Sequence, residues 1–160
     1  MKKIFTLVLL GAFCMLNAQA FKGKGDTKFN LGMNIQDGGT GIVASTDFGL
    51  GENISVGVLA SYLLGGSHIS VVNSDYRFDA KLRFNANLGN VLNVDPHFDL
   101  YPGLNLGIKN FGGHLGARYF FSEGFGIFSE FSVPIAKYDT EAISRYNNGA
   151  TFDIGVSFNL

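Results

Sequence analysis

A histidine and a serine two residues apart come closest to a catalytic group in this sequence of 160 residues. They lie within Ser67-His68-Ile69-Ser70, and Asp75 and Asp79 follow downstream as nearby acids. A histidine, a serine and an acid are the residue types of a nucleophilic catalytic group, although a polar loop with a lone histidine has the same residues. The sequence therefore offers His68 and Ser70 only as weak catalytic candidates, and we otherwise expect a protein that is not an enzyme.

Other motifs that carry chemistry are missing from the sequence. It contains no HExxH, CxxC, P-loop or GxSxG pattern, and its one cysteine is Cys14. The formal net charge is −1 and no cluster of Lys and Arg is present, which argues against a nucleic-acid partner. We therefore expect no metal site, no cofactor and no nucleic acid.

The first twenty residues have the composition of a secretion signal. Lys2 and Lys3 precede an apolar run over residues 4–16, and Asn17-Ala18-Gln19-Ala20 offers a small-x-small cleavage site. Because the run is short for a helix that spans a membrane, an N-terminal anchor is the less favoured alternative. We predict a cleaved signal peptide over residues 1–20.

The rest of the chain alternates apolar and polar residues and does not follow a helical period. From residue 76 to residue 88 every even position is apolar and every odd position is polar. At about 3.3 Å per residue such a strand extends roughly 40 Å, enough to cross a bilayer at a tilt and project beyond it. Strands are predicted over residues 28–36, 42–50, 54–64, 76–88, 98–108, 114–121, 125–133 and 150–160.

Eight strands can close into an antiparallel sheet with both chain ends on one side. The connections 51–53, 89–93 and 122–124 on that side are short. Of the four on the other side, 65–75 and 134–148 are long, whereas 37–39 and 110–112 are tight. Short turns on one rim and longer loops on the other are typical of outer-membrane barrels. We therefore predict an all-β fold, an eight-stranded antiparallel up-and-down transmembrane β-barrel. Its predicted divisions are the signal peptide 1–20, a short periplasmic segment 21–27 and the barrel 28–160.

The polar face of the strands indicates which side of the sheet lies inside. It carries nearly equal numbers of basic and acidic residues together with many glycines, which relieve crowding in a narrow lumen. Charges packed there must pair, because an unpaired buried charge is very costly. We expect the apolar face outside, against lipid, and a filled lumen with no continuous aqueous channel. The predicted lumen charge network comprises Arg77, Asp79, Lys81, Arg83, Arg118, Glu130 and Asp153.

One ion pair of this network follows from the expected register. If residues 122–124 form a three-residue turn, Glu130 lies opposite Gly116 and diagonal to Arg118. Long side chains reach diagonal partners, so an ion pair between Arg118 and Glu130 is predicted. The alternative is that both side chains point into water in the lumen.

The last strand resembles the C-terminal signal of outer-membrane barrels. Asp153-Ile154-Gly155-Val156-Ser157-Phe158-Asn159-Leu160 has its polar, glycine, aromatic and terminal hydrophobic positions, with Leu160 in place of the more usual aromatic residue. Gly116-Ala117-Arg118-Tyr119-Phe120-Phe121 and Phe125-Gly126-Ile127-Phe128 are similar to strands six and seven of the same proteins. From about Lys28 to Leu160, the chain thus resembles the small outer-membrane β-barrel family of the OmpA/OmpX type. The resemblance implies the outer membrane of a diderm bacterium, and an insertion signal that the barrel-assembly machinery reads at Gly155, Phe158 and Leu160.

The expected function is structural or one of interaction at the cell surface, in contact with outer-membrane lipid. Loops 65–75 and 134–148 would face outward, with Tyr138, Arg145 and Tyr146 as candidate contacts for an unknown extracellular partner. These loops could equally be inert connections.

Two other classes of function stay open. The grouping of His68 and Ser70 resembles that of outer-membrane lipid A deacylases, which implies an enzyme that modifies lipid. A soluble lipocalin-like barrel that binds an apolar ligand is the other.

Overall fold

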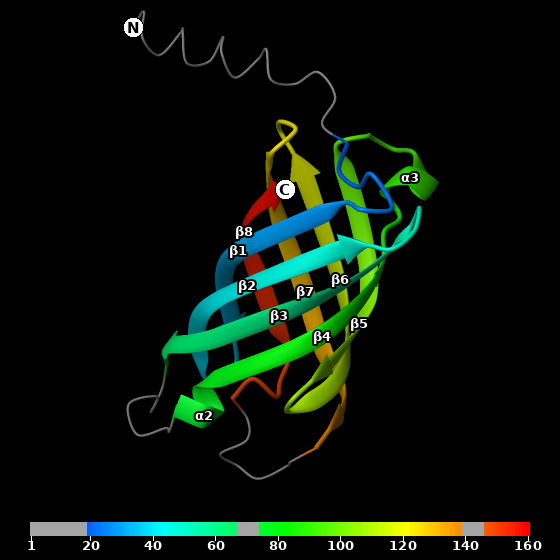
Figure 1. The fold of residues 1–160 in the computed structure, drawn as a ribbon. Coiled ribbons are helices and arrows are strands. Elements are labelled where there is room, and N and C mark those ends of the chain that lie inside the picture. Colours follow the sequence, from blue (N-terminus) through cyan, green and yellow to red (C-terminus); the bar gives the residue numbers. More distant parts are fainter. Residues whose placement is uncertain (1–18, 67–73, 139–145) are drawn as a thin grey trace, which may run out of the picture.

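The protein is a closed antiparallel barrel of eight strands, in which each strand pairs with its neighbours in the chain and β8 pairs with β1. This computed structural model describes residues 19–66, 74–138 and 146–160 (Figure 1). The elements are β1 (Thr27–Gln36), β2 (Gly39–Gly49), β3 (Ile54–Gly65), α2 (Ser74–Arg77), β4 (Phe78–Ala86), α3 (Gly89–Leu92), β5 (Phe98–Gly107), β6 (Asn110–Phe120), β7 (Phe125–Lys137) and β8 (Thr151–Asn159). The predicted all-β class, number of strands and up-and-down order are confirmed.

Several strands have ends that differ from the predicted ones. Strand β4 is shorter than predicted, because residues 76 and 77 lie in α2 and the strand ends at Ala86. The sequence predicted tight connections over residues 37–39 and 110–112, but β2 already begins at Gly39 and β6 at Asn110, and a ladder shifts its register near each of these starts. Strand β7 likewise continues past Pro134, which pairs with Gly112 beside one of these shifts. Proline has no N–H for the ladder, and an irregularity of this kind is where a strand tolerates it.

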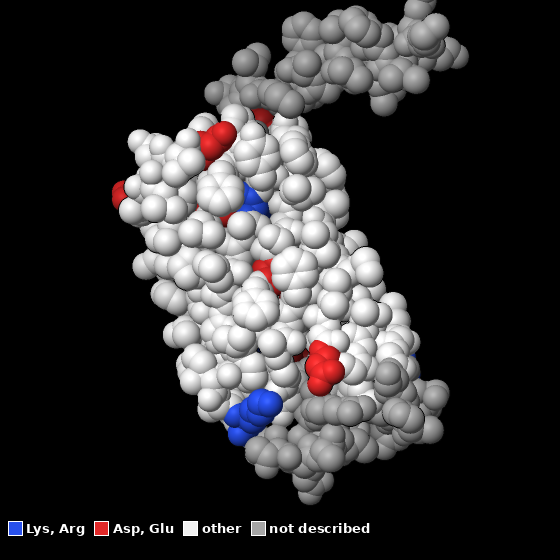
Figure 2. Space-filling view, turned by 180° about the vertical axis from the view of Figure 1, so that it is seen from behind, with Lys and Arg blue, Asp and Glu red and all other residues white. Residues whose placement is uncertain are grey.

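The apolar face of the sheet is outside and the polar face is inside, as predicted. Phe84 and Ile154 are each 46% exposed, whereas Arg83 and Asp153 are each 3% exposed. Figure 2 shows the result on one side of the molecule, where the wall between the two ends is almost entirely uncharged, with only small charged patches. None of the helices among the described residues is both long and apolar enough to cross a bilayer.

Glycines make room for large side chains in the lumen. The fully buried ring of Tyr101 lies against the backbone of Gly116, its partner in the ladder, so that a Cβ at this position would overlap the ring. The ring of His114 covers its own ladder partner, Gly103, in the same way. Two adjacent strands thus hold two rings flat against the wall, because two glycines face them.

The N-terminal segment closes the end of the barrel at which both β1 begins and β8 ends (Figure 1). Ala20 and Phe21 are buried there, and Ala20 packs against Phe120. The backbone N–H of Ala20 donates a hydrogen bond to the carbonyl of Pro96, and the amide of Asn90 donates one to the carbonyl of Phe21. These partners lie in the connection 87–97, which contains α3 and is longer than the short turn predicted over 89–93.

The opposite end is closed by the last described residues of the connection between β7 and β8. Asn147 has a left-handed backbone conformation (φ 58°), which asparagine tolerates better than most residues. Its side-chain amide donates hydrogen bonds to the carbonyls of Tyr76 and Arg77, and its carbonyl oxygen accepts one from Gln36. The chain is therefore tied across the mouth of the barrel at this end.

Replacing Gly116 with alanine tests the close packing of the lumen. Since the new Cβ would overlap the ring of Tyr101, we expect the Gly116→Ala substitution to lower the free energy of unfolding by about 1–3 kcal/mol. The matched control is Gly124→Ala, because a Cβ at Gly124 meets no atom within 4 Å. Urea denaturation followed by circular dichroism measures both variants, and equal midpoints for the two would contradict the packing described here.

Candidate functional site

A chain of five buried ion-pairing side chains crosses the middle of the lumen. The carboxylate of Asp47 lies between two arginines, 3.3 Å from Nε of Arg83 and 3.2 Å from Nη1 of Arg118. Arg83 also donates to Glu130, and Nε of Arg118 lies 3.4 Å from Oδ2 of Asp99. These side chains come from β7, β4, β2, β6 and β5. Three of the four ion pairs join strands that are not neighbours in the sheet, whereas Arg118 and Asp99 are ladder partners on the adjacent strands β6 and β5.

Aromatic and amide groups complete this network. The ring of Tyr101 lies 4.1 Å from the guanidinium carbon of Arg118 and 5.9 Å from that of Arg83, as in cation–π pairs. Nη2 of Arg118 also donates to Oδ1 of Asn87, at 3.1 Å. Each arginine is thus held by more than one type of partner, as a buried cation requires.

The side chains of the predicted network lie on the lumen face, with one exception. Asp79 and Lys81 face each other with Nζ and Oδ2 3.5 Å apart, and Asp153 accepts a hydrogen bond from the amide of Asn34. The exception is Arg77, which belongs to α2 because β4 begins only at the next residue. Its Nε donates to the carbonyl of Leu63 at the rim.

The predicted ion pair of Arg118 with Glu130 is replaced by other pairs. The register behind the prediction is correct, since Glu130 lies opposite Gly116. The two side chains nevertheless turn to other partners. Arg118 meets Asp47 across the lumen and Asp99, its ladder partner on β5, while Glu130 meets Arg83 across the lumen. Asp47 and Asp99 were missed as members of the network, although both lie on the polar face that the alternation identifies.

A second ion pair lies at the mouth that the N-terminal segment closes. Nζ of Lys28 is 2.8 Å from Oδ1 of Asp26 and 2.9 Å from Oδ1 of Asn159, and it lies over the ring of Phe120. Sequence reasoning could not pair Asp26 with Lys28, because Asp26 precedes the first strand and has no place in the alternation.

The predicted surface contacts and catalytic candidates have different outcomes. Tyr138 is 55% exposed at the end of β7, but Tyr146 is 3% exposed, because it packs against Leu63 inside the mouth of the barrel. Tyr146 is therefore not available as a surface contact. Arg145, His68 and Ser70 lie outside the described residues. Within the described ranges, no group of three or more His, Cys, Asp or Glu side chains is arranged to hold a metal ion.

The residues of the predicted insertion signal lie along β8 and just beyond it. Phe158 faces outward between the rings of Phe29 and Phe125, at centroid distances of 6.3 Å and 5.8 Å. Gly155 packs against the backbone of Gly32 with no room for a Cβ, and Leu160 is exposed. The signal thus combines a glycine that allows close strand packing with an aromatic cluster on the outer wall.

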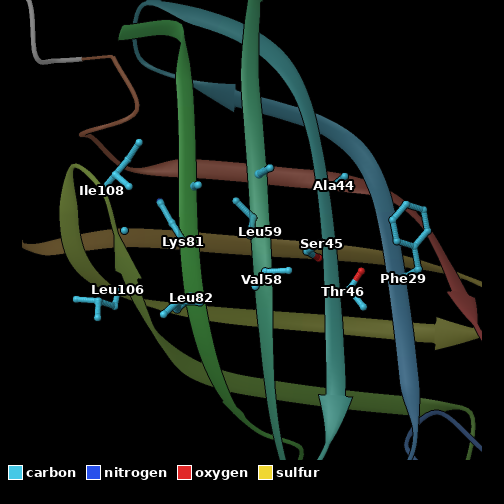
Figure 3. A pocket seen from close by; sticks show the side chains of 13 residues that line it. Phe29, Ala44, Ser45, Thr46, Val58, Leu59, Lys81, Leu82, Leu106 and Ile108 are labelled. Atoms are coloured by element: carbon cyan, nitrogen blue, oxygen red, sulfur yellow. The ribbon is translucent and has the colours of Figure 1, made fainter. Parts of the chain in front are cut away.

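The outer wall has an apolar hollow of about 530 Å³ over β1–β5 (Figure 3). Ala44, Ala60 and Ala80 are successive ladder partners, so that three small side chains lie in one row across three strands. The next row of outward-facing side chains along the strands, which includes Val58 and Leu82, is larger and forms one side of the hollow.

Removing one buried cation tests the lumen network. We expect Arg118→Met to lower the free energy of unfolding by about 3–5 kcal/mol, because Asp47 and Asp99 each lose a partner away from water. Adding Asp99→Asn should recover part of this loss, and the matched control Lys137→Met, which removes an exposed cation, should have little effect. Urea midpoints compare the variants, and an Arg118→Met variant as stable as the control would contradict the network.

Comparisons with known proteins agree with this geometry at the level of the fold. A designed transmembrane β-barrel is 12% identical, with a TM-score of 0.60 over 87% of this chain and 98% of that chain. The N-terminal β-barrel domain of OprF from Pseudomonas aeruginosa is 14% identical, with a TM-score of 0.59 over 87% of this chain and 100% of that domain. No curated protein matches the sequence. A family model matches residues 11–160, and the chain therefore belongs to DUF6646, a family of unknown function.

Proposed function

We propose that this protein is an integral outer-membrane β-barrel with a structural or surface-interaction role and no pore. The observation that carries the proposal is the distribution of polarity. Large apolar side chains are exposed around the wall, while the charged side chains of the strands face the lumen, apart from the exposed Lys137 at the end of β7. A closed barrel also satisfies its backbone hydrogen bonds within the sheet, as hydrocarbon surroundings require.

The same distribution argues against a soluble barrel that binds an apolar ligand. Such a protein needs an apolar cavity inside and a solvated surface outside. Here the middle of the lumen holds Arg83, Arg118 and Asp47, and the outer wall carries aliphatic and aromatic side chains. A lipocalin-like barrel would therefore need the opposite distribution of polar and apolar side chains.

The proposed orientation places the end with both termini in the periplasm. The opposite end then faces outside, where residues 66–77 and 138–150 connect strands and Tyr138 is exposed. An extracellular partner would contact these connections. The outward-facing ring of Phe158 and the exposed Leu160 at the end of the chain's last strand support recognition by barrel-assembly machinery during insertion, with Gly155 in the same strand.

An enzyme that modifies membrane lipid is less well supported. Of the two acids that follow His68 and Ser70 in the sequence, Asp79 points into the lumen and faces Lys81. It therefore faces away from the outer wall, where a lipid substrate would lie. Unchanged lipid A acylation in cells that carry Ser70→Ala would exclude the enzymatic alternative.

Extraction and gel mobility test the membrane location. We expect the protein to stay with the membrane fraction until detergent is added, because its exposed belt is apolar. We also expect the folded form to migrate differently from the boiled form in SDS gels, because a closed barrel resists the detergent. Recovery from the periplasm or medium without detergent would contradict the proposal.

Recordings in planar bilayers test the absence of a pore. The side chains of Arg118, Tyr101 and Phe120 are fully buried within the lumen, and eight strands leave little room beside them. We therefore expect no stable single-channel conductance from the purified protein. A reproducible conductance step would overturn this part of the proposal.

A further inference from the structure

At the rim that holds the termini, an acid, a histidine and a tyrosine lie together on the outside of the barrel. The backbone N–H and Nδ1 of His97 both donate to Oδ1 of Asp95, at 2.8 Å and 2.7 Å. The ring of His97 is 6.0 Å from that of Tyr119, which in turn is 5.4 Å from that of Phe121. All of these side chains are partly or largely exposed.

The Asp95 carboxylate is set up to remain charged. The hydrogen bond from the backbone N–H of His97, and next the one from its ring, lower the pKa of Asp95 below its usual range. Both hydrogen bonds go to Oδ1, so Oδ2 remains at the surface for a ligand. His97 thus acts as a positioning residue that fixes a negative charge close to an aromatic ring.

Just inside the rim, the outer wall has a second apolar hollow, of about 270 Å³. Ala117 and Ser129 are ladder partners, and their small side chains form its floor. The row nearer the rim pairs Tyr119 with Ile127, and Ile154 borders the hollow on the next strand. The hollow has the width of two strands and is lined almost entirely by apolar groups.

Tyr119 belongs to both features, which makes them one amphipathic site. Its ring lies beside His97 at the rim and also lines the hollow. A ligand that fills the site needs a cationic group that donates hydrogen bonds at one end and an apolar chain at the other. A primary ammonium meets the first need, because it can donate to Oδ2 of Asp95 and lie against the face of an aromatic ring.

We propose that Asp95, Tyr119 and the hollow over Ala117 and Ser129 bind a phospholipid with an ethanolamine headgroup in the inner leaflet. The ammonium pairs with Asp95 over Tyr119, and an acyl chain fills the hollow. This inference rests on the proposed membrane location. A phosphatidylglycerol headgroup would meet the negative charge without compensation. A phosphatidylcholine headgroup keeps its charge but cannot donate a hydrogen bond.

Quenching of tryptophan fluorescence by brominated lipids tests this site. The protein contains no tryptophan, so a single reporter can be placed with Val156→Trp, on the ladder partner of Ile127 beside the hollow. The control reporter is Val58→Trp in β3, on the other outer hollow. Each variant is reconstituted in bilayers that contain brominated phosphatidylethanolamine, phosphatidylcholine or phosphatidylglycerol.

The expected result is a preference that is local and depends on Asp95. At the Val156→Trp reporter, phosphatidylethanolamine should bind about two- to fivefold more tightly than phosphatidylcholine, the range expected of one partly exposed ion pair. The Val58→Trp reporter should show no preference. Asp95→Asn should abolish the preference, whereas the control Glu123→Gln, which neutralises another exposed acid at the same rim, should leave it intact.

Filling the hollow tests the acyl-chain part of the site. Ala117→Leu should reduce quenching at the Val156→Trp reporter by all three lipids. Ala60→Leu, the same change in the other hollow, should not affect that reporter.

Two negative results have different meanings. Equal quenching by the three headgroups at Val156→Trp, or a preference that survives Asp95→Asn, would overturn this inference alone. If neither reporter were quenched by any brominated lipid, the chain would not lie in the bilayer, and the proposed function would fail with it.

Discussion

The structure depends on pairing charge in a narrow space that excludes water. Asp47 lies between Arg83 and Arg118, and each arginine reaches a second carboxylate on a further strand. A charged side chain without a partner would be very unfavourable at this depth, so each charged side chain of the network requires opposite charges beside it. Because three of the four ion pairs join strands that are not neighbours in the sheet, the network favours one closed arrangement over slipped ones. In a sheet, a slip by one residue would turn the whole charged set outward.

The same constraint explains why large rings and glycines occur together in the lumen. Tyr101 and His114 lie flat over Gly116 and Gly103, and Tyr101 also lies beside both arginines. A lumen of eight strands has no space for a ring and a facing side chain at the same height. Glycine, which weakens a strand on an open surface, here makes room for the groups that surround the buried charges.

The sequence was sufficient to predict which face of each strand lies outside and the register between neighbouring strands, but not the contacts across the lumen. Alternation depends only on the pleat of each strand, so it correctly assigned Phe84 to the outside and Arg83 to the inside. Register between adjacent strands follows from a turn, which placed Glu130 opposite Gly116. The pair of Arg118 and Asp47 joins residues 71 positions apart on strands that are not neighbours, and no local pattern encodes it. Tyr146 lies in a connection, which the alternation does not describe, so its burial was not foreseen. The alternation continues through residues 76 and 77 although they lie in α2, which is why it wrongly placed Arg77 in the lumen.

A barrel whose lumen is filled and whose mouths are covered can interact only through its outer wall and its rims. The N-terminal segment covers one mouth with Ala20 and Phe21, and Asn147 ties the chain across the other. The lumen carboxylates are committed to partners within the barrel, whereas Asp95 stands outside it, with one oxygen still at the surface. An acid in this position adds nothing to the lumen network. The charge of Asp95, the ring of Tyr119 and the apolar hollow beside that ring together suit an amphipathic ligand that lies along the outer wall. The structural role of charge in the lumen and the proposed recognition role of Asp95 are therefore separated in space, the first enclosed by the sheet and the second at its edge.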